Sequence, residues 1–207
     1  MRSILIIGMH RSGTSAVTQA ISSMGAHVRF PTGYWENLEL TGLNQDILSS
    51  YGRSWDDPAG LPDGWEDNIP INQVAKDVFH DNLGKYPQWI WKDPRNCIML
   101  PLWEKYIGDP IVVFIKRDPI EIAKSLQNRN GFSIQKGLDL CSIYDDHATR
   151  NTEDFVVKHI EYSDLVENTK TVLRDLYLFL KKADVENIHH APFNGGIDAS
   201  LRHHGVT

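Results

Sequence analysis

The sequence predicts an α/β domain of three layers, in which helices flank a central, mostly parallel sheet of about four to five strands. Two observations support this prediction. Short apolar runs rich in β-branched residues alternate along the chain with segments of helical periodicity. The clearest run, 111–115, is apolar throughout, as strands buried on both faces of a parallel sheet are. Strands that alternate with helices imply right-handed crossover connections.

The composition fits a single domain spanning residues 1–207. With 21 Lys plus Arg against 27 Asp plus Glu, the net charge of −6 argues against a general nucleic-acid binder but allows a local basic pocket. Two cysteines, Cys97 and Cys141, are too few for a disulfide framework, and we expect buried thiols in a reducing compartment. No apolar stretch suits a membrane span or a secretory signal. We therefore expect a cytoplasmic protein.

The first half of the chain opens with a strand, a glycine loop and a helix. Residues 4–7 form an apolar run closed by Gly8, and the helix that follows can end at Gly25. A second helix is expected to begin near Asn37, although Gly42 inside it disfavours helix. The residues expected to face inward are Ala16, Val17, Ala20, Ile21 and Met24 in the first helix, and Leu40, Leu43, Ile47 and Tyr51 in the second.

Residues 51–70 differ in character, because they are rich in glycine, proline and acidic residues. A loop of this length inside a compact domain is usually functional or mobile, so we expect an insertion or a lid. Trp55 and Trp65 lie within it. They either help to cover a substrate or pack onto the body of the domain.

Regular alternation returns after residue 70. The pattern predicts a helix over 71–86, strands at 89–91, 111–115 and 155–160, and helices over 134–148 and 172–180. Asp118 is expected to cap another helix, with Pro119 at its first position. The histidine pairs at 189–190 and 203–204 have no Cys or carboxylate at ligand spacing, so no metal site is expected there.

The loop from Gly8 to Ser15 lies between a strand and a helix, where backbone N–H groups and a helix N-terminus can bind an anion. Four residues separate its glycines, as in the nucleoside-triphosphate loop G-x-x-x-x-G-K-[ST], but Thr14 stands in place of the lysine. Arg11 can supply the positive charge instead. The alternative is a plain strand–turn–helix corner without a ligand.

Two motifs resemble those of a known family. His10-Arg11-Ser12-Gly13-Thr14-Ser15 is similar to the 5′-phosphosulfate loop of sulfotransferases that use 3′-phosphoadenosine 5′-phosphosulfate (PAPS). Arg117-Asp118-Pro119 followed by Ser125 resembles the 3′-phosphate signature of that family. Seven residues are close to two helical turns, so Ser125 can face the strand end from which Arg117 emerges. Alternatively, Arg117 pairs with an acid and Ser125 is solvated.

Weaker likenesses are Trp91-Lys92-Asp93-Pro94-Arg95, which resembles a segment of bacterial-type members, and Tyr34-Trp35-Glu36, which resembles the stretch that carries the catalytic acid in some members. The resemblance implies a fold like that of P-loop NTPases. It also implies sulfuryl transfer from PAPS to a hydroxyl or amine of an acceptor such as a carbohydrate or a small metabolite, without a metal.

The resemblance assigns residues to these roles. Glu36 is the candidate base, with His10 and Asp93 as rivals, and Arg11 and Lys92 are the candidate catalytic cations. The residues expected to bind PAPS are His10, Arg11, Ser12, Gly13, Thr14, Ser15, Arg117 and Ser125.

Two other functions remain open. A nucleotide kinase or NTPase with a degenerate loop would hold magnesium through Asp93 or Asp118. A non-catalytic nucleotide-binding protein would bind without turnover. In the acceptor site, Tyr34, Trp35, Trp55 and Trp65 can stack on a sugar ring or belong to the core.

Overall fold

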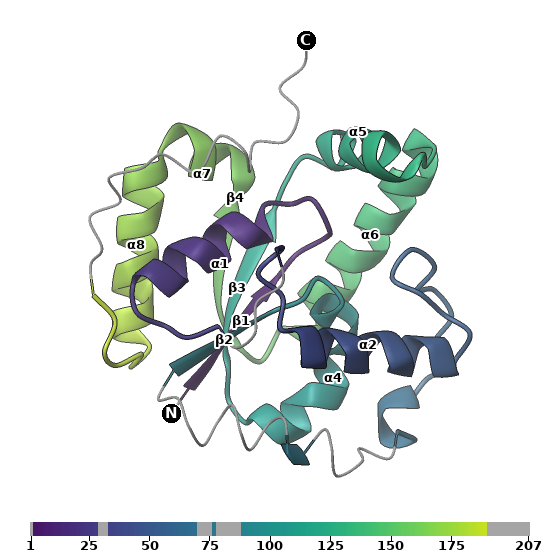
Figure 1. Ribbon diagram of the computed structural model, residues 1–207, viewed down its shortest axis with the longest axis horizontal. Helices are drawn as coiled ribbons and strands as arrows, with labels where there is room; N and C mark the ends of the chain where they lie inside the picture. Colours follow the sequence, from purple (N-terminus) through teal and green to yellow (C-terminus); the bar gives the residue numbers. More distant parts are fainter. Residues whose placement is uncertain (1, 29–32, 70–75, 78–87, 190–207) are drawn as a thin grey trace.

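A computed structural model describes residues 2–28, 33–69, 76–77 and 88–189 (Figure 1). Its sheet contains four strands, β1 (Arg2–Ile7), β2 (Gln88–Lys92), β3 (Ile111–Lys116) and β4 (Val156–Glu161), all parallel and in the order β2-β1-β3-β4. The predicted three-layer α/β fold with a parallel sheet is thus confirmed.

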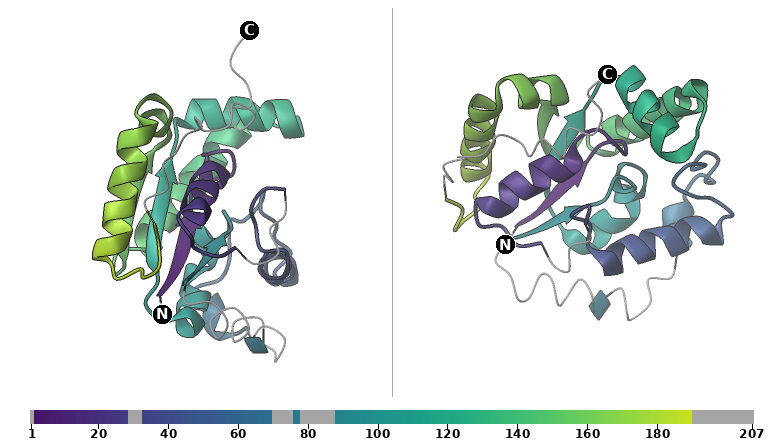
Figure 2. Two further views of the ribbon diagram at one scale, coloured as in Figure 1. Left: turned by 60° about the vertical axis from the view of Figure 1, so that its left-hand side comes forward. Right: turned by 45° about the horizontal axis from the view of Figure 1, so that its top comes forward.

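Helices cover both faces of the sheet (Figures 1 and 2). Alternate strand residues divide between two cores, so that Leu5 and Phe114 face one and Ile6 and Val113 face the other. The first core takes its helical side chains from α2 (Leu38–Ser50), α4 (Asn96–Ile107), α5 (Pro119–Asn130) and α6 (Ile134–Asn151). The second takes them from α1 (Thr14–Ser23), α7 (Tyr162–Glu167) and α8 (Thr169–Lys182).

The helix α4 was not expected from the sequence. Pro101 lies in its interior, where proline normally breaks a helix. Its residues 96–100 are all buried, so no polar face reveals the helical period. The helix predicted over 172–180 lies within α8, whereas the short helix α7 before it was not predicted. Most of the expected helix 71–86, and His190, His203 and His204, lie outside the described residues.

Within residues 51–69, the 3₁₀ turn η1 (Trp65–Asp67) places Trp65 in the first core. The Tyr144 hydroxyl donates to the carbonyl of Trp55 at 2.8 Å, and Lys136 pairs with Asp56 at 2.8 Å. Both partners are in α6, so this segment packs onto the body of the domain, and only Trp55 borders the cavity described below.

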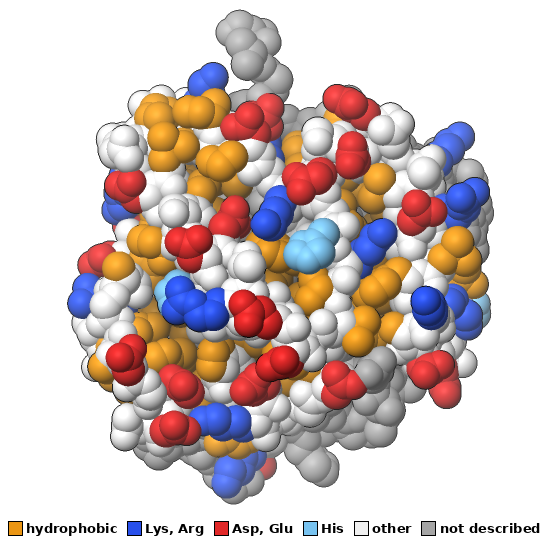
Figure 3. Space-filling view, turned by 180° about the vertical axis from the view of Figure 1, so that it is seen from behind, with side chains coloured by type: hydrophobic (Ala, Val, Ile, Leu, Met, Phe, Trp, Pro, Cys, Tyr) orange, Lys and Arg blue, Asp and Glu red, His pale blue; other side chains and the backbone are white. Residues whose placement is uncertain are grey.

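The surface opposite to the view of Figure 1 carries basic and acidic side chains side by side (Figure 3). This mixture agrees with the net charge of −6. In the part of the chain that the structure describes, no helix is long and apolar enough to cross a membrane.

Candidate active site

The parallel strands β1, β2 and β3 end at the same edge of the sheet, where a cavity of about 290 Å³ opens. Ligands of open α/β sheets bind at this edge. The cavity is lined by His10, Arg11, Gly13, Thr14, Ser15 and Ala16 from the first loop and helix, Gly33, Tyr34 and Glu36 before α2, and Trp55, Lys92, Pro94, Arg95, Arg117, Arg129 and Tyr162. It therefore contains five side chains that are cationic in their usual state and one carboxylate.

The loop between β1 and α1 has the backbone of an anion-binding nest. Arg11 and Gly13 adopt left-handed conformations with φ of 73° and 100°, so neighbouring N–H groups can converge on one ligand. A Cβ on Gly13 would lie 2.4 Å from the Tyr162 ring, so glycine is required there. Beneath the loop, the Gly8 N–H donates to the Cys97 Sγ at 3.3 Å.

The structure brings Arg117 and Ser125 together through Arg11. The Arg11 Nε donates to the Ser125 Oγ at 2.9 Å, and the Arg117 Nη1 donates to the Arg11 carbonyl at 3.0 Å. Arg117 also pairs with Glu121 at 2.8 Å, as one alternative expected, whereas Ser125 is buried rather than solvated. Burial, followed by the charges of Arg129 and Arg117, lowers the pKa of Arg11. An anion placed among these guanidinium groups would relieve their repulsion.

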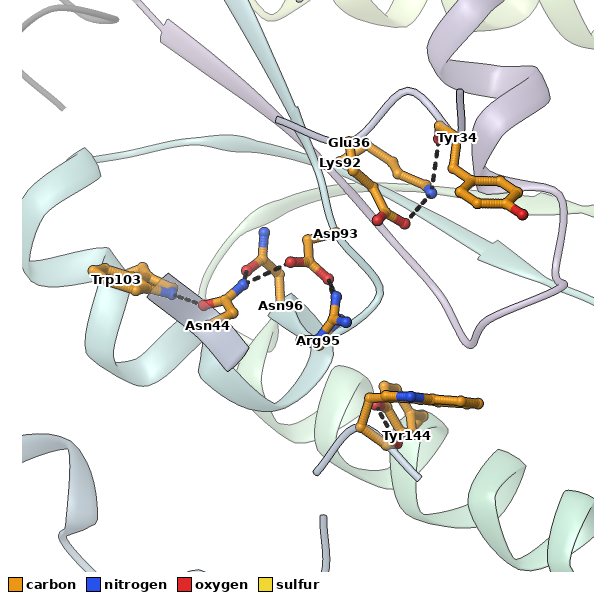
Figure 4. A network of polar contacts seen from close by, with 10 residues as sticks. Tyr34, Glu36, Asn44, Lys92, Asp93, Arg95, Asn96, Trp103 and Tyr144 are labelled. Carbon is orange, nitrogen blue, oxygen red and sulfur yellow. Dashed lines mark hydrogen bonds and ion pairs between the residues drawn. The ribbon is translucent and has the colours of Figure 1, made fainter. Parts of the chain in front are cut away.

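Glu36 and Lys92 form an ion pair at the cavity wall. The Lys92 Nζ donates to the Glu36 Oε1 at 2.7 Å and to the Tyr34 carbonyl at 3.0 Å (Figure 4). The Ser15 hydroxyl donates to the same carbonyl at 2.9 Å, which joins this pair to the loop. Burial lowers the pKa of Lys92 although the charge of Glu36 opposes the shift. Trp35, which lies between Tyr34 and Glu36 in the sequence, has a φ of 62°, and its side chain packs against the second core.

The two rival bases lie in different surroundings. Asp93 is fully buried, accepts bonds from Arg95 and Asn44, and does not line the cavity. His10 does line it, and its ring lies 4.6 Å from that of Trp55. Burial and the charges of Arg95 and Lys92 hold the pKa of His10 well below its usual value, so the ring is neutral at pH 7. Its Nε2 is buried without a hydrogen-bond partner.

The carboxylates proposed for a magnesium site do not meet in the cavity. Asp118 caps α5, accepting from the Ile120 N–H at 2.7 Å, and Asp93 is engaged in the buried bonds just described. Neither residue lines the cavity. The described residues contain no cluster of three or more His, Cys, Asp or Glu side chains that could hold a metal ion.

The four aromatic candidates for sugar stacking are separated. Trp35 and Trp65 pack in the two cores, and Tyr34 is 59% exposed at the cavity. Trp55 lines the cavity, but its ring already contacts His10, Phe132 and the Arg129 guanidinium. An open aromatic face for a sugar is therefore not provided by Trp35, Trp55 or Trp65.

Sequence reasoning missed three cations or aromatic residues of the cavity. Arg129 follows Ser125 by four residues, so it lies on the same face of α5, and this spacing was a usable signal. Arg95 ends the Trp91–Arg95 motif, but the sequence alone assigned no role to it. Tyr162 is the first residue of α7, directly after β4, and no local pattern connects it to the loop that it contacts through Gly13.

Comparison with known proteins decides the family, because the model of the sulfotransferase family matches residues 3–185. The chain belongs to the sulfotransferase family. No curated protein sequence matches this sulfotransferase-family chain significantly.

Solved structures of sulfotransferases share its fold. The sulfotransferase domain of an olefin synthase from Synechococcus PCC 7002 aligns over 100% of this chain and 89% of its own, with 16% identity and a TM-score of 0.58. A sulfotransferase from Alicyclobacillus acidocaldarius covers 87% of this chain and 81% of its own, at 15% identity and a TM-score of 0.55. The sulfotransferase domain from the curacin biosynthetic pathway covers 87% and 74%, at 16% identity and a TM-score of 0.57.

Proposed function

We propose that this chain transfers a sulfuryl group from PAPS to a hydroxyl or amine of a small-molecule or carbohydrate acceptor. The observation that carries the proposal is that the Glu36–Lys92 pair and the guanidinium groups of Arg11 and Arg117 line one cavity beside the anion-binding loop. A proton acceptor and the cations for an anionic donor are thereby brought together. Ser125 does not line the cavity but lies behind Arg11, which donates to it.

The residues of the cavity fit a donor that bears two phosphate groups and a sulfuryl group. The loop N–H groups and Arg11 would bind the 5′-phosphosulfate, as their nest geometry favours. Arg117 would bind the 3′-phosphate, with the Ser125 hydroxyl beside it after a shift of the Arg11 side chain that now occupies it. Arg129 also lines the cavity and adds a third guanidinium group to this cluster. Its positive charge contributes to the lowered pKa of Arg11.

PAPS supplies the sulfuryl group: a bond forms from the acceptor oxygen or nitrogen to sulfur while the bond from sulfur to the 5′-phosphate oxygen breaks. Glu36 takes the proton that the acceptor loses. Lys92 donates two of its three N–H groups to Glu36 and Tyr34, which leaves the third to stabilise the leaving phosphate oxygen with Arg11. Such a contact contributes about 3 kcal/mol to transition-state stabilisation.

Two features support this proposal over a kinase. Thr14 replaces the lysine that holds the outer phosphates of a triphosphate. Asp93 and Asp118 accept hydrogen bonds from Asn44 and from the Ile120 N–H, away from the cavity.

The position of Glu36 in the cavity favours catalysis over nucleotide binding alone. Cys97 and Cys141 are buried free thiols, which suit the cytoplasm that we propose as the compartment.

The direct test is a transfer assay with ³⁵S-labelled PAPS and a panel of phenols, sugars and amines, run with EDTA. We expect labelled product and one equivalent of adenosine 3′,5′-bisphosphate. Binding of the bisphosphate without turnover on any acceptor, including water, would instead support the non-catalytic protein.

A further inference from the structure

A polar side chain interrupts the buried stripe of α2. Leu40, Asn44 and Leu48 are four residues apart, so they follow one line along the helix, and all three are fully buried. Burying an amide in an apolar seam is unfavourable unless its hydrogen bonds are satisfied. Asn44 therefore requires specific partners at this position.

The partners of Asn44 fix the orientation of its amide (Figure 4). The Trp103 indole can only donate, and it donates to the Asn44 Oδ1 at 2.7 Å. The Asn44 Nδ2 donates to the Asp93 Oδ2 at 2.9 Å and to the Asn96 Oδ1 at 3.0 Å. Both hydrogen atoms and the oxygen of the amide are thus engaged, and reversing the amide would break all three bonds.

This network connects α2 to residues of the cavity. Asp93 directly follows Lys92, and its other oxygen accepts from the Arg95 backbone N–H at 2.9 Å and the Arg95 Nη1 at 3.0 Å. At the other end, α2 begins just after Glu36, where the Asn37 side chain caps it by accepting from two backbone N–H groups. The same two segments meet again in the cavity as the Glu36–Lys92 pair at 2.7 Å.

We propose that Asn44 is a positioning residue that sets the register of α2 and so holds the Glu36 carboxylate against Lys92. This inference rests on the proposed function, in which Glu36 takes the proton of the acceptor. A slip of one residue turns a helix by about 100° and would remove every partner of Asn44. Leucine side chains at 40 and 48 discriminate registers less, because apolar contacts are not directional.

The test compares Asn44→Leu with Leu48→Ala, which removes buried volume from the same helix without touching the network. Crystal structures of both variants give the distance from the Lys92 Nζ to the Glu36 Oε1. We expect this distance to exceed about 3.5 Å, the usual upper limit for a hydrogen bond, in Asn44→Leu only. Trp103→Phe, which removes one donor and keeps an aromatic ring, provides a milder variant should Asn44→Leu fail to fold.

Kinetics provide the second measurement. With ³⁵S-labelled PAPS and an acceptor found in the panel, or water, Asn44→Leu should lower kcat at least tenfold while the Kd for adenosine 3′,5′-bisphosphate changes less than threefold. Leu48→Ala should lose thermal stability but keep kcat within threefold. An unchanged ion-pair distance in Asn44→Leu, or equal losses of kcat in both variants, would overturn the inference. If the wild-type protein transfers nothing, the proposed function fails, yet the crystallographic distances still decide the role of Asn44.

Discussion

Glu36, the proposed base, is held by an ion pair and follows a residue with an unusual backbone conformation. Its carboxylate is bonded to Lys92, and the residue before it, Trp35, adopts a left-handed backbone while packing on the second core. A non-glycine residue in this conformation is costly, and such strain is found mainly where a site needs a fixed geometry. The left-handed residue thus directly precedes the residue whose carboxylate pairs with Lys92.

Glu36→Gln should therefore separate chemistry from binding. The change keeps the shape of the side chain but removes the base, so turnover should fall by roughly 10²–10⁴. The affinity for adenosine 3′,5′-bisphosphate, measured by calorimetry, should stay within about threefold. Glu39→Gln, in the first turn of α2 and away from the cavity, is the matched control. Near-normal turnover of Glu36→Gln would move the role to His10, the other candidate on the cavity.

Arg117 combines contacts to the loop with a proposed contact to the donor. Arg117→Ala should weaken binding of the 3′-phosphorylated nucleotide by about 2 kcal/mol, because charged hydrogen bonds are lost. Binding of adenosine 5′-phosphosulfate, which lacks the 3′-phosphate, should hardly change. Glu121→Gln, which removes only the ion-pair partner, controls for disturbance of α5. Equal losses for both ligands would show that Arg117 acts through its bond to the Arg11 carbonyl instead.

At the scale of elements, α5 begins where the sequence predicts. Asp118 accepts the Ile120 N–H at 2.7 Å and Pro119 occupies the first helical position. Asp118→Ala should lower the free energy of unfolding by about 1 kcal/mol, whereas Asp118→Asn should cost only a few tenths, since asparagine is also a good cap. Urea denaturation measures both. If Asp118 bound magnesium as in a kinase, both variants would abolish a magnesium-dependent affinity for ATP.

The elements also show what the sequence can and cannot predict. Strands β1 and β3 and the loop between β1 and α1 follow from local patterns, because burial on both faces and glycine spacing leave clear signals. The helix α4 does not, because its first five residues are all buried and Pro101 follows them. The role of Asn44 was likewise not predictable, since a lone asparagine in a helix gives no indication that Asp93 lies opposite.

For the site, residues within one motif were predictable and contacts between motifs were not. Arg11, Glu36 and Lys92 were named from the sequence and lie on one cavity. The bond from Arg11 to Ser125, 114 residues apart, depends on the order of the strands, which local periodicity does not encode.

For the whole molecule, His10 couples the site to stability at acidic pH. Its pKa lies well below 6.5 in the folded protein because burial disfavours the charged ring. The unfolded chain therefore binds the proton first, so stability is fully present above about pH 6.5 and declines as the pH falls below it, by up to about 1.4 kcal/mol per pH unit. His10→Asn should flatten this decline in denaturation curves between pH 7 and 5. An unchanged slope would show that His10 takes up its proton with the same pKa in the folded and the unfolded chain.

We propose that the whole cavity binds a sulfuryl donor in preference to a nucleoside triphosphate. Calorimetry of adenosine 3′,5′-bisphosphate against ATP with magnesium tests it most directly, because both ligands carry the same base and several phosphate charges. Thr14 in place of the loop lysine and the Arg117 cluster at the end of β3 predict at least tenfold tighter binding of the bisphosphate, or about 1.4 kcal/mol. Tighter binding of ATP with magnesium would refute this preference and favour a kinase.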